Sequence, residues 1–457
     1  MNRKSRKGGT AMAQQETPWY KLDNAGTLYS ALQQERYSAV YRFSAWMTEP
    51  VDPAALQRAI DRCMPRFPGF CVRMRRGLFW NYFEPNTAPG PFLKEDVSDP
   101  CQPVRFRENQ GYLVRFYYYG RRISFEAFHA LADGTGSLIF FRSLLAEYLR
   151  LLGHPIPAGP GLLDPREPPR YETELEDAYL RYAGKTARPQ PLMRRAYSNR
   201  GEPEPFYTFH VTMGFLSVAQ LKERTKALGV SITEYLSAAL IHVLLQKQAR
   251  EVSERHRRPV ALAIPIDLRA FFPTESLRNF ILTTQLAVDP ALGDYTFQEL
   301  LSRVHHDLRF HCNPQDLRAI FTRNIRYEQR RILKLIPRVL KDPVIAWNYR
   351  TRGVLPYTAT FTNPGAFRVP PEMEPQIQHM EVVLGQATVA RPHVSSISYG
   401  DILEITFAGT QKETETERDF FRFLVSQGLH VRIESNRPMG GGKEETECPT
   451  VSTAAWS

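Results

Sequence analysis

Apolar and polar residues alternate between positions 122 and 128, where Ile123, Phe125 and Ala127 share one side of the chain. This period of two predicts a half-buried strand. Immediately downstream, apolar residues recur every three or four positions from Leu138 to Leu152, which predicts a helix that begins near position 134 and ends at 153. The stretch FHALADG at 128–134 therefore lies in the turn that leads from a strand end into a helix start.

The same periodicities predict much of the remaining secondary structure. We expect strands at 37–47, 112–119, 206–216, 260–264, 395–400 and 402–408, and helices at 53–64, 218–228, 231–248 and 415–428. Two of these helices carry start signals. Asp52 followed by Pro53 precedes the first, and the capping box Ser231-Ile-Thr-Glu234 opens the third.

A change of composition divides the chain into two halves. Residues 155–205 are rich in Pro, Arg, Glu and Gly with little periodicity, which is typical of a crossover linker. We therefore predict an N-terminal half at 18–154 and a C-terminal half at 206–435. The basic stretch 1–17 and the polar, Gly-rich stretch 436–457 are predicted to be disordered tails.

Composition limits the class of protein. A chain of 457 residues with 42% hydrophobic residues can bury a sizeable core. Its formal charge of +11 suits an anionic partner such as a nucleotide-bearing cosubstrate, an acidic carrier protein, nucleic acid or a lipid surface, although a solvated basic surface is the better explanation of most of these charges. The five cysteines follow neither a zinc nor a disulfide pattern, and no run of about 18 apolar residues occurs, so we expect no transmembrane segment and a cytoplasmic location.

His129 is the candidate for chemistry. An imidazole at a strand end is a good general base because its ordinary pKa of about 6.5 lies near neutral pH. Asp133 has two readings: it caps the helix that begins at Gly134, or it forms an ion pair that fixes the loop. A histidine with a purely structural role beside a capping aspartate is an equally consistent reading of these residues alone.

The stretch 128–134 resembles the His-His-x-x-x-Asp-Gly motif of the superfamily that contains chloramphenicol acetyltransferases, plant-type alcohol acyltransferases, condensation domains and alcohol acetyltransferases. The resemblance makes His129 the base, and gives Asp133 and Gly134 structural roles. Phe128 stands where the family has its first histidine. The segments RFP at 66–68 and GLFW at 77–80 are similar to signatures of bacterial alcohol acetyltransferase-like members, the second with one extra residue.

Further residues match the superfamily over about residues 18–435. In the segment DLR, Arg269 corresponds to an arginine that pairs with the motif aspartate, and Asn279 belongs to an Asn-Phe that follows it. Such a pair is physically favourable, because a guanidinium binds a carboxylate through two parallel hydrogen bonds. Asn363 and Gly365, in the segment TNPG, correspond to residues that line the family's tunnel. These two and Asn279 are our candidates for tunnel lining or for holding the oxyanion, with Asn363 as the first candidate for the oxyanion donor.

The resemblance implies an α/β fold of two-layer sandwiches, in two similar halves with an active-site tunnel between them. It implies transfer of an acetyl or a short to medium acyl group from a coenzyme A or acyl carrier protein thioester to a small hydroxyl acceptor, with no bound cofactor, metal or nucleic acid. The alternatives are carrier-protein-dependent condensation or N-acyl transfer, a non-catalytic module that binds acyl chains or carrier proteins, and a basic RNA- or membrane-associated protein. The histidines at 305, 306 and 311 suit a basic helix face better than a metal site.

Overall fold

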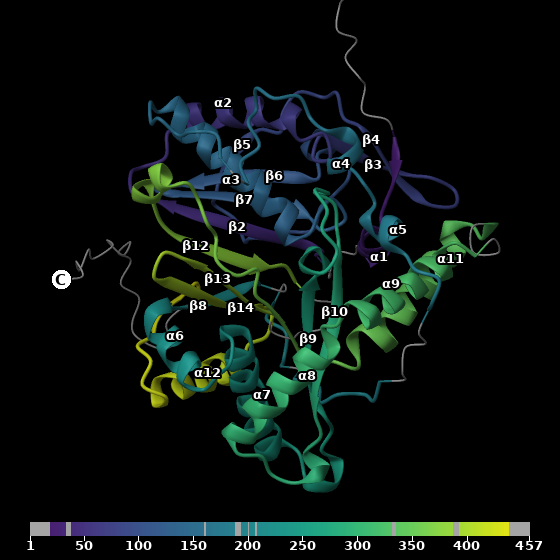
Figure 1. The fold of residues 1–457 in the computed structure, drawn as a ribbon, viewed down its shortest axis with the longest axis vertical. Helices are drawn as coiled ribbons and strands as arrows, with labels where there is room; N and C mark the ends of the chain where they lie inside the picture. Colours follow the sequence, from purple (N-terminus) through teal and green to yellow (C-terminus); the bar gives the residue numbers. More distant parts are fainter. Residues whose placement is uncertain are drawn as a thin grey trace, which may run out of the picture.

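The strand expected at 122–128 is the middle strand, β7, of a five-stranded sheet (Figure 1). The computed structural model describes residues 19–32, 38–159, 161–187, 193–199, 201–205, 208–330, 335–386 and 393–437. The tails expected at 1–17 and 436–457 lie outside these residues, apart from 436 and 437. In order, the sheet consists of β12 (Ile377–Leu384), β2 (Val40–Met47), β7 (Arg122–Phe128), β6 (Val114–Tyr119) and β5 (Leu93–Glu95).

Two helices cover this sheet. They are α2 (Pro53–Cys63) and α3 (Gly134–Leu151), which also pack against each other. The ring of Phe140 on α3 lies 4.9 Å from that of Phe125 on β7, so the helix that follows the motif rests on the motif strand. Both predicted starts are observed, because the Asp52 carboxylate accepts from Ala54 N and Asp133 caps α3.

The second half is built on a seven-stranded sheet. Its order is β10 (Ile281–Val288), β9 (Val260–Asp267), β11 (Ala359–Thr362), β13 (His393–Tyr399), β14 (Ile402–Gly409), β8 (His210–Ser217) and β15 (Arg432–Ser435). Its helices are α6 (Val218–Ala227), α7 (Ile232–Glu251), α8 (Phe297–His311) and α12 (Glu415–Ser426). The capping box at Ser231 is present, and the hairpin expected around position 400 joins β13 to β14.

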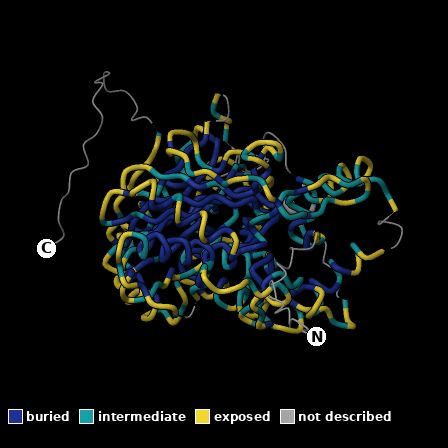
Figure 2. Tube along the Cα trace, turned by 90° about the horizontal axis from the view of Figure 1, so that it is seen from above, coloured by how far each residue is buried: buried dark blue, intermediate teal, exposed yellow. Residues whose placement is uncertain are grey.

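A third, small sheet and several short helices lie beside the two halves. The sheet consists of β1 (Tyr20–Lys21), β4 (Asn81–Pro85) and β3 (Val72–Arg76), and the helices are α1 (Asn24–Leu32), α4 (Tyr171–Glu174), α5 (Ala178–Tyr182), α9 (Pro314–Glu328) and α11 (Arg338–Asn348). Figure 2 shows that the buried residues lie in the interior, with exposed residues around them. The fold is therefore the expected α/β arrangement of two halves.

β12 changes the division into halves. It lies between β11 and β13 in sequence, yet it pairs antiparallel with β2, with Met380 opposite Ala45. Its other side packs against β13 and β14 (Figure 1). The sheet of the N-terminal half is thus completed by a strand from the C-terminal half. A single boundary between the halves at residues 155–205 does not describe this exchange.

The linker region is anchored to the N-terminal half. Arg66, from the RFP segment, makes two hydrogen bonds of 2.7 Å to the carboxylate of Glu174 on α4, and both side chains are buried. A two-fold pairing of this kind fixes both position and orientation. Within the described residues, no single helix is long and apolar enough to cross a membrane, although the pair α6 and α7, bent by 85°, passes that test jointly by length and composition.

Candidate functional site

His129 follows the last residue of β7 and faces the C-terminal half. Its backbone N–H donates to Ala39 O at 2.7 Å, which extends the pairing with the neighbouring β2 by one step. The backbone on both sides of the histidine is therefore fixed. Its imidazole is half-buried and stacks on Tyr29 of α1 with ring centroids 4.1 Å apart, while Tyr41 of β2 meets it edge-on at 4.9 Å.

Asn279 defines the tautomer of this imidazole. Its amide nitrogen donates to His129 O at 3.0 Å and faces the carboxylate oxygens of Asp23 at 3.4 Å. The amide oxygen is consequently turned toward His129 Nδ1, at 3.2 Å. Because that oxygen can only accept, Nδ1 carries the proton and the lone pair of a neutral ring lies on Nε2.

Burial lowers the pKa of His129 below its usual value, because the surroundings disfavour the charged ring. Backbone carbonyls, the charge of Asp133 and the hydrogen bond with Asn279 oppose that effect in part. The imidazole is therefore neutral at pH 7. A neutral imidazole with a fixed Nδ1 proton can accept a proton at Nε2.

Asp133 performs both of the functions that the sequence left open. One carboxylate oxygen accepts from Gly136 N at 3.0 Å and caps α3. The other accepts from Arg269 Nη1 and from Phe280 N, both at 2.7 Å. The side chain of Asp133 is only 1% exposed and that of Arg269 only 11%, so this is a buried ion pair across the two halves.

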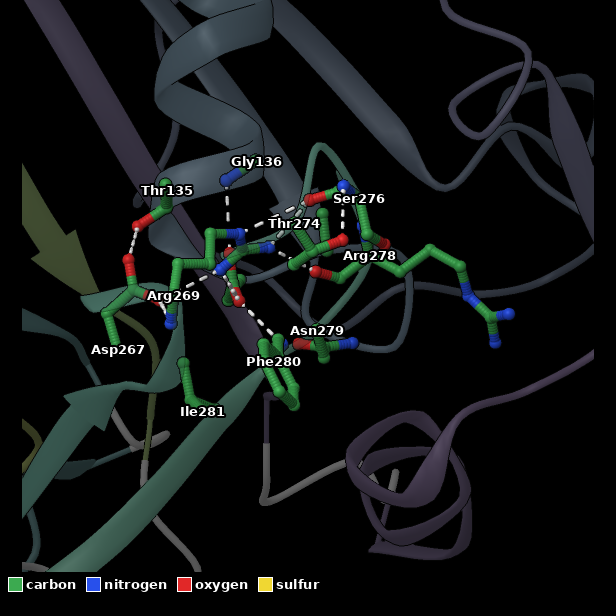
Figure 3. A network of polar contacts seen from close by, with 12 residues as sticks. Thr135, Gly136, Asp267, Arg269, Thr274, Ser276, Arg278, Asn279, Phe280 and Ile281 are labelled. Carbon is green, nitrogen blue, oxygen red and sulfur yellow. Dashed lines mark hydrogen bonds and ion pairs between the residues drawn. The ribbon is translucent and has the colours of Figure 1, made fainter. Parts of the chain in front are cut away.

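Arg269 organises the loop between β9 and β10, as Figure 3 shows. Its guanidinium also donates to the carbonyls of Ser276 at 2.9 Å and Arg278 at 2.6 Å, and to the carboxylate of Asp267 at 3.1 Å. Asp267 in turn accepts from the Thr135 hydroxyl at 2.7 Å. The loop that carries Asn279 is thereby held against the start of α3.

The two halves approach each other closely at Gly136. A Cβ atom placed on this residue would lie 2.1 Å from Leu277 O, so any side chain here would force the backbone to shift. A Cβ atom on Gly134 would instead meet Phe43 at 3.7 Å, an ordinary contact. In the first turn of α3, position 136 therefore requires glycine, whereas position 134 can accommodate a Cβ atom.

We expect Gly136→Ala to lower the free energy of unfolding by about 1–3 kcal/mol, because an added methyl group in a filled contact forces the backbone apart. Gly134→Ala is the matched control and should be neutral or stabilise the protein by about 0.5–1 kcal/mol. Denaturant unfolding of the two variants measures both values. Equal stability of the two variants would contradict the close approach of Gly136 and Leu277.

Phe128 does not contact the base. Because successive side chains of a strand point to opposite faces, Phe128 is directed into the N-terminal core, where its ring packs on Phe106 at 5.7 Å. The substitution of the first motif histidine by phenylalanine is thus accommodated by apolar packing.

Asn363 and Gly365 lie in the turn after β11. The amide of Asn363 donates to the Thr233 hydroxyl at 3.1 Å and its oxygen accepts from Gly365 N at 2.9 Å. Gly365 has a φ of 85°, which favours glycine. β11 runs parallel to β9, so this turn lies at the same sheet edge as Asp267, but among the contacts of the described residues neither residue touches His129. Their part in lining a tunnel or holding an oxyanion stays a prediction, as does the tunnel itself.

Sequence reasoning missed Asp23, Tyr29, Tyr41 and Gly136. Tyr41 holds the motif loop through its hydroxyl, which donates to Ala132 O at 2.8 Å and lies 2.6 Å from Ser137 Oγ. Gly136 had a usable signal, because a glycine inside a predicted helix indicates a close approach. Asp23, Tyr29 and Tyr41 had no such signal in the sequence, since they reach the site only through tertiary contacts.

Asp23 provides a pH-dependent test. Burial raises its pKa to about 6, against the opposing charge of Arg278. A carboxyl group whose folded pKa is raised stabilises the protein fully below its unfolded pKa, near 4, and that stability is lost as the pH rises through about 6. Relative to the wild type, Asp23→Asn should therefore become more stable by on the order of 2–3 kcal/mol between pH 4 and 7.

The measurement is denaturant unfolding of both proteins at several pH values between these limits. Asp99→Asn, which removes an exposed carboxylate, is the control and should unfold with the wild-type pH dependence. A constant difference between wild type and Asp23→Asn over this range would refute the raised pKa.

In the part of the chain that the structure describes, no group of three or more His, Cys, Asp or Glu side chains could hold a metal ion. His305 instead lies 3.3 Å from the carboxylate of Glu234.

Two sheet-and-helix halves of this kind are also the fold of solved trichothecene acetyltransferases and condensation domains. TRI101 of F. graminearum, complexed with coenzyme A and T-2 mycotoxin, superimposes with a TM-score of 0.61 at 11% identity, over 90% of this chain and 99% of that one. The trichothecene 15-O-acetyltransferase TRI3 of Fusarium sporotrichioides gives 0.58 at 11% identity, over 89% and 94%. The condensation domain of the monacolin K polyketide synthase MokA gives 0.56 at 13% identity, over 90% and 96%.

No family model matches the sequence, and no curated protein matches it. At these identities the likeness establishes the fold. The roles of the site residues rest on the geometry described above.

Proposed function

We propose that the protein is an acyltransferase that moves an acyl group from a coenzyme A or carrier-protein thioester to a hydroxyl acceptor, with His129 as the general base. The observation that supports this proposal is the neutral, oriented imidazole: Asn279 holds Nδ1 at 3.2 Å, and the lone pair of Nε2 remains for a proton. A base needs this combination of fixed geometry and a pKa below the working pH.

The mechanism is direct transfer. Nε2 removes the proton of the acceptor hydroxyl as its oxygen attacks the thioester carbonyl carbon. The tetrahedral intermediate then collapses, the carbon–sulfur bond breaks, and the thiolate takes the proton back from the imidazolium. Asp133 is not the base, because its carboxylate is occupied by Arg269, Gly136 N and Phe280 N. Asn363 is our candidate for the oxyanion donor.

The nature of the donor is supported by two observations. TRI101 of the same fold was solved with coenzyme A, and this chain has a formal charge of +11, which favours a phosphate-bearing or acidic donor. We propose an acetyl or short to medium acyl chain and an alcohol acceptor, in line with the signatures at 66–68 and 77–80.

Product analysis tests the proposal. The protein is incubated with a series of acyl-coenzyme A donors and a panel of alcohols and amines, thiol release is followed, and products are identified by mass spectrometry. We expect an ester formed one-to-one with free thiol and only when both substrates are present. Amide products restricted to carrier-bound donors would indicate a condensation enzyme, and acyl-coenzyme A binding without turnover would indicate a non-catalytic module.

A further inference from the structure

Helix α11 (Arg338–Asn348) turns its apolar side toward solvent. Val339, Leu340, Val344 and Trp347 are between 59% and 79% exposed, and three of them recur at positions 340, 344 and 347, the spacing of one helix face. A surface helix of a water-soluble protein normally directs such a face into the core. On α11 these four apolar residues face solvent instead, while Ile345 and Ala346 are half-buried.

Three polar residues of α11, Arg338, Lys341 and Asp342, are half-buried, whereas Asn348 is exposed. Arg338 pairs with Asp342 at 2.8 Å, and its backbone N–H donates to Leu78 O at 2.8 Å. Lys341 Nζ donates to Phe79 O at 2.6 Å. These contacts seat the helix on the turn between β3 and β4, so its orientation is set by several specific bonds and the outward apolar face follows from them.

The β3–β4 turn extends the apolar area. Leu78 is 66% exposed and Trp80 is 40% exposed. We name Leu78, Trp80, Val339, Leu340, Val344 and Trp347 the α11 surface. Large exposed apolar residues that gather in this way mark an interaction site, whereas single ones are ordinary.

The sequence around α11 is basic. Residues 323–354 contain nine Lys or Arg and two Asp or Glu, a net charge of +7 out of +11 for the chain. Exposed cations border the β3–β4 turn: Lys21 Nζ lies 5.1 Å from the ring of Trp80, and Arg76 ends β3 opposite Asn81. The side chain of Asn81 in turn contacts Arg338.

We propose that the α11 surface docks on an anionic lipid membrane. The apolar face with tryptophan suits the boundary between acyl chains and headgroups, and the surrounding cations suit anionic headgroups. A second copy of the chain fits less well, because like charges would face each other across a symmetric contact. An acidic partner protein also fits less well. The exposed face of α11 presents apolar side chains to it, whereas Arg338 and Lys341 already bind other groups of this chain.

Docking would occur one helix away from His129. α11 packs against α1, and α1 supplies Tyr29, whose ring stacks on the imidazole (Figure 1). A membrane on the α11 surface therefore lies on the same side of the molecule as α1. The proposal concerns binding and does not depend on acyl transfer.

Flotation with vesicles tests this proposal in the absence of any acyl donor. We expect the full chain to bind vesicles of phosphatidylcholine that contain about 30% phosphatidylglycerol, to bind pure phosphatidylcholine more weakly, and to be released in part by salt. The triple variant Leu340→Gln, Val344→Gln, Trp347→Gln should bind on the order of a hundredfold more weakly, because three large apolar side chains no longer enter the interface.

The matched control is Val97→Gln, Leu292→Gln, Val425→Gln, which removes equally exposed apolar residues from three other elements. It should bind as the wild type does, and both triple variants should unfold at the wild-type temperature because all six residues are exposed. Absence of wild-type binding, or equal binding by the two variants, would refute the proposal. Light scattering without vesicles provides a second refutation: a wild-type dimer that the α11 variant converts to a monomer would assign the surface to a second copy.

Discussion

His129→Ala should reduce thioester-dependent acyl transfer by roughly a hundred- to ten-thousandfold, because general-base catalysis at Nε2 is lost while substrate binding remains. His129→Asn should lose as much activity. In the wild type, His129 Nδ1 lies 3.2 Å from Asn279 Oδ1. The amide of the introduced asparagine can still donate to that oxygen, but it has no basic nitrogen. The measurement is kcat/KM for thiol release with the donor and acceptor that the product analysis identifies.

The controls separate catalysis from packing. His430→Ala removes an exposed histidine and should keep wild-type turnover. Because burial lowers the pKa of His129, the acid limb of the wild-type profile of kcat/KM should lie below about 6.5. The ring is half-buried and stacks on Tyr29, so His129→Asn is the better test of chemistry. Near wild-type turnover of both His129 variants would show that another group is the base.

Asp133→Ala should lower the free energy of unfolding by about 3–5 kcal/mol, because it leaves the buried guanidinium of Arg269 without its carboxylate. Arg269→Ala should cost a similar amount, since the carboxylate of Asp133 and the carbonyls of Ser276 and Arg278 all lose a donor. Both variants should also lose activity, because the loop that carries Asn279 is released. Denaturant unfolding and turnover measure the two effects.

The double variant Asp133→Ala, Arg269→Ala should be less destabilised than the sum of the two single variants, because the second change removes a charge that the first had left unpaired. Asp133→Asn is a useful control: it can still accept from Gly136 N as a helix cap but carries no charge for Arg269. Because the amide nitrogen that replaces the second carboxylate oxygen cannot accept, this variant should lose the bonds from Arg269 and Phe280 N while it keeps the helix cap. Additive losses in the double variant would mean that the pair contributes no coupling energy across the halves.

The local sequence determined which residues form the strand and the helix on either side of the motif. The alternation at 122–128 and the apolar spacing after 138 predict β7 and α3 correctly, because the backbone periods of two and 3.6 residues select which side chains face the core. Asp52, Ser231 and Asp133 cap their helices as read from the sequence, since a cap binds amide groups only two or three residues away.

Resemblance of the motif, rather than periodicity, pointed to the superfamily fold and to a contact between Arg269 and Asp133. The sequence left capping and pairing as alternatives for Asp133. They are not exclusive, because each of its two carboxylate oxygens has its own donors. Only the positions of both halves could establish that.

Long-range geometry determined the rest. The sequence did not predict that β12 joins the sheet of the N-terminal half, because pairing with a strand more than 300 residues away leaves no signal in the periodicity of β12 itself. The tautomer of His129 depends on Asn279 and Asp23, which meet it only after the halves assemble. On α11, which face meets water was decided by the bonds of Arg338 and Lys341 to the β3–β4 turn, since periodicity defines a face without defining its direction.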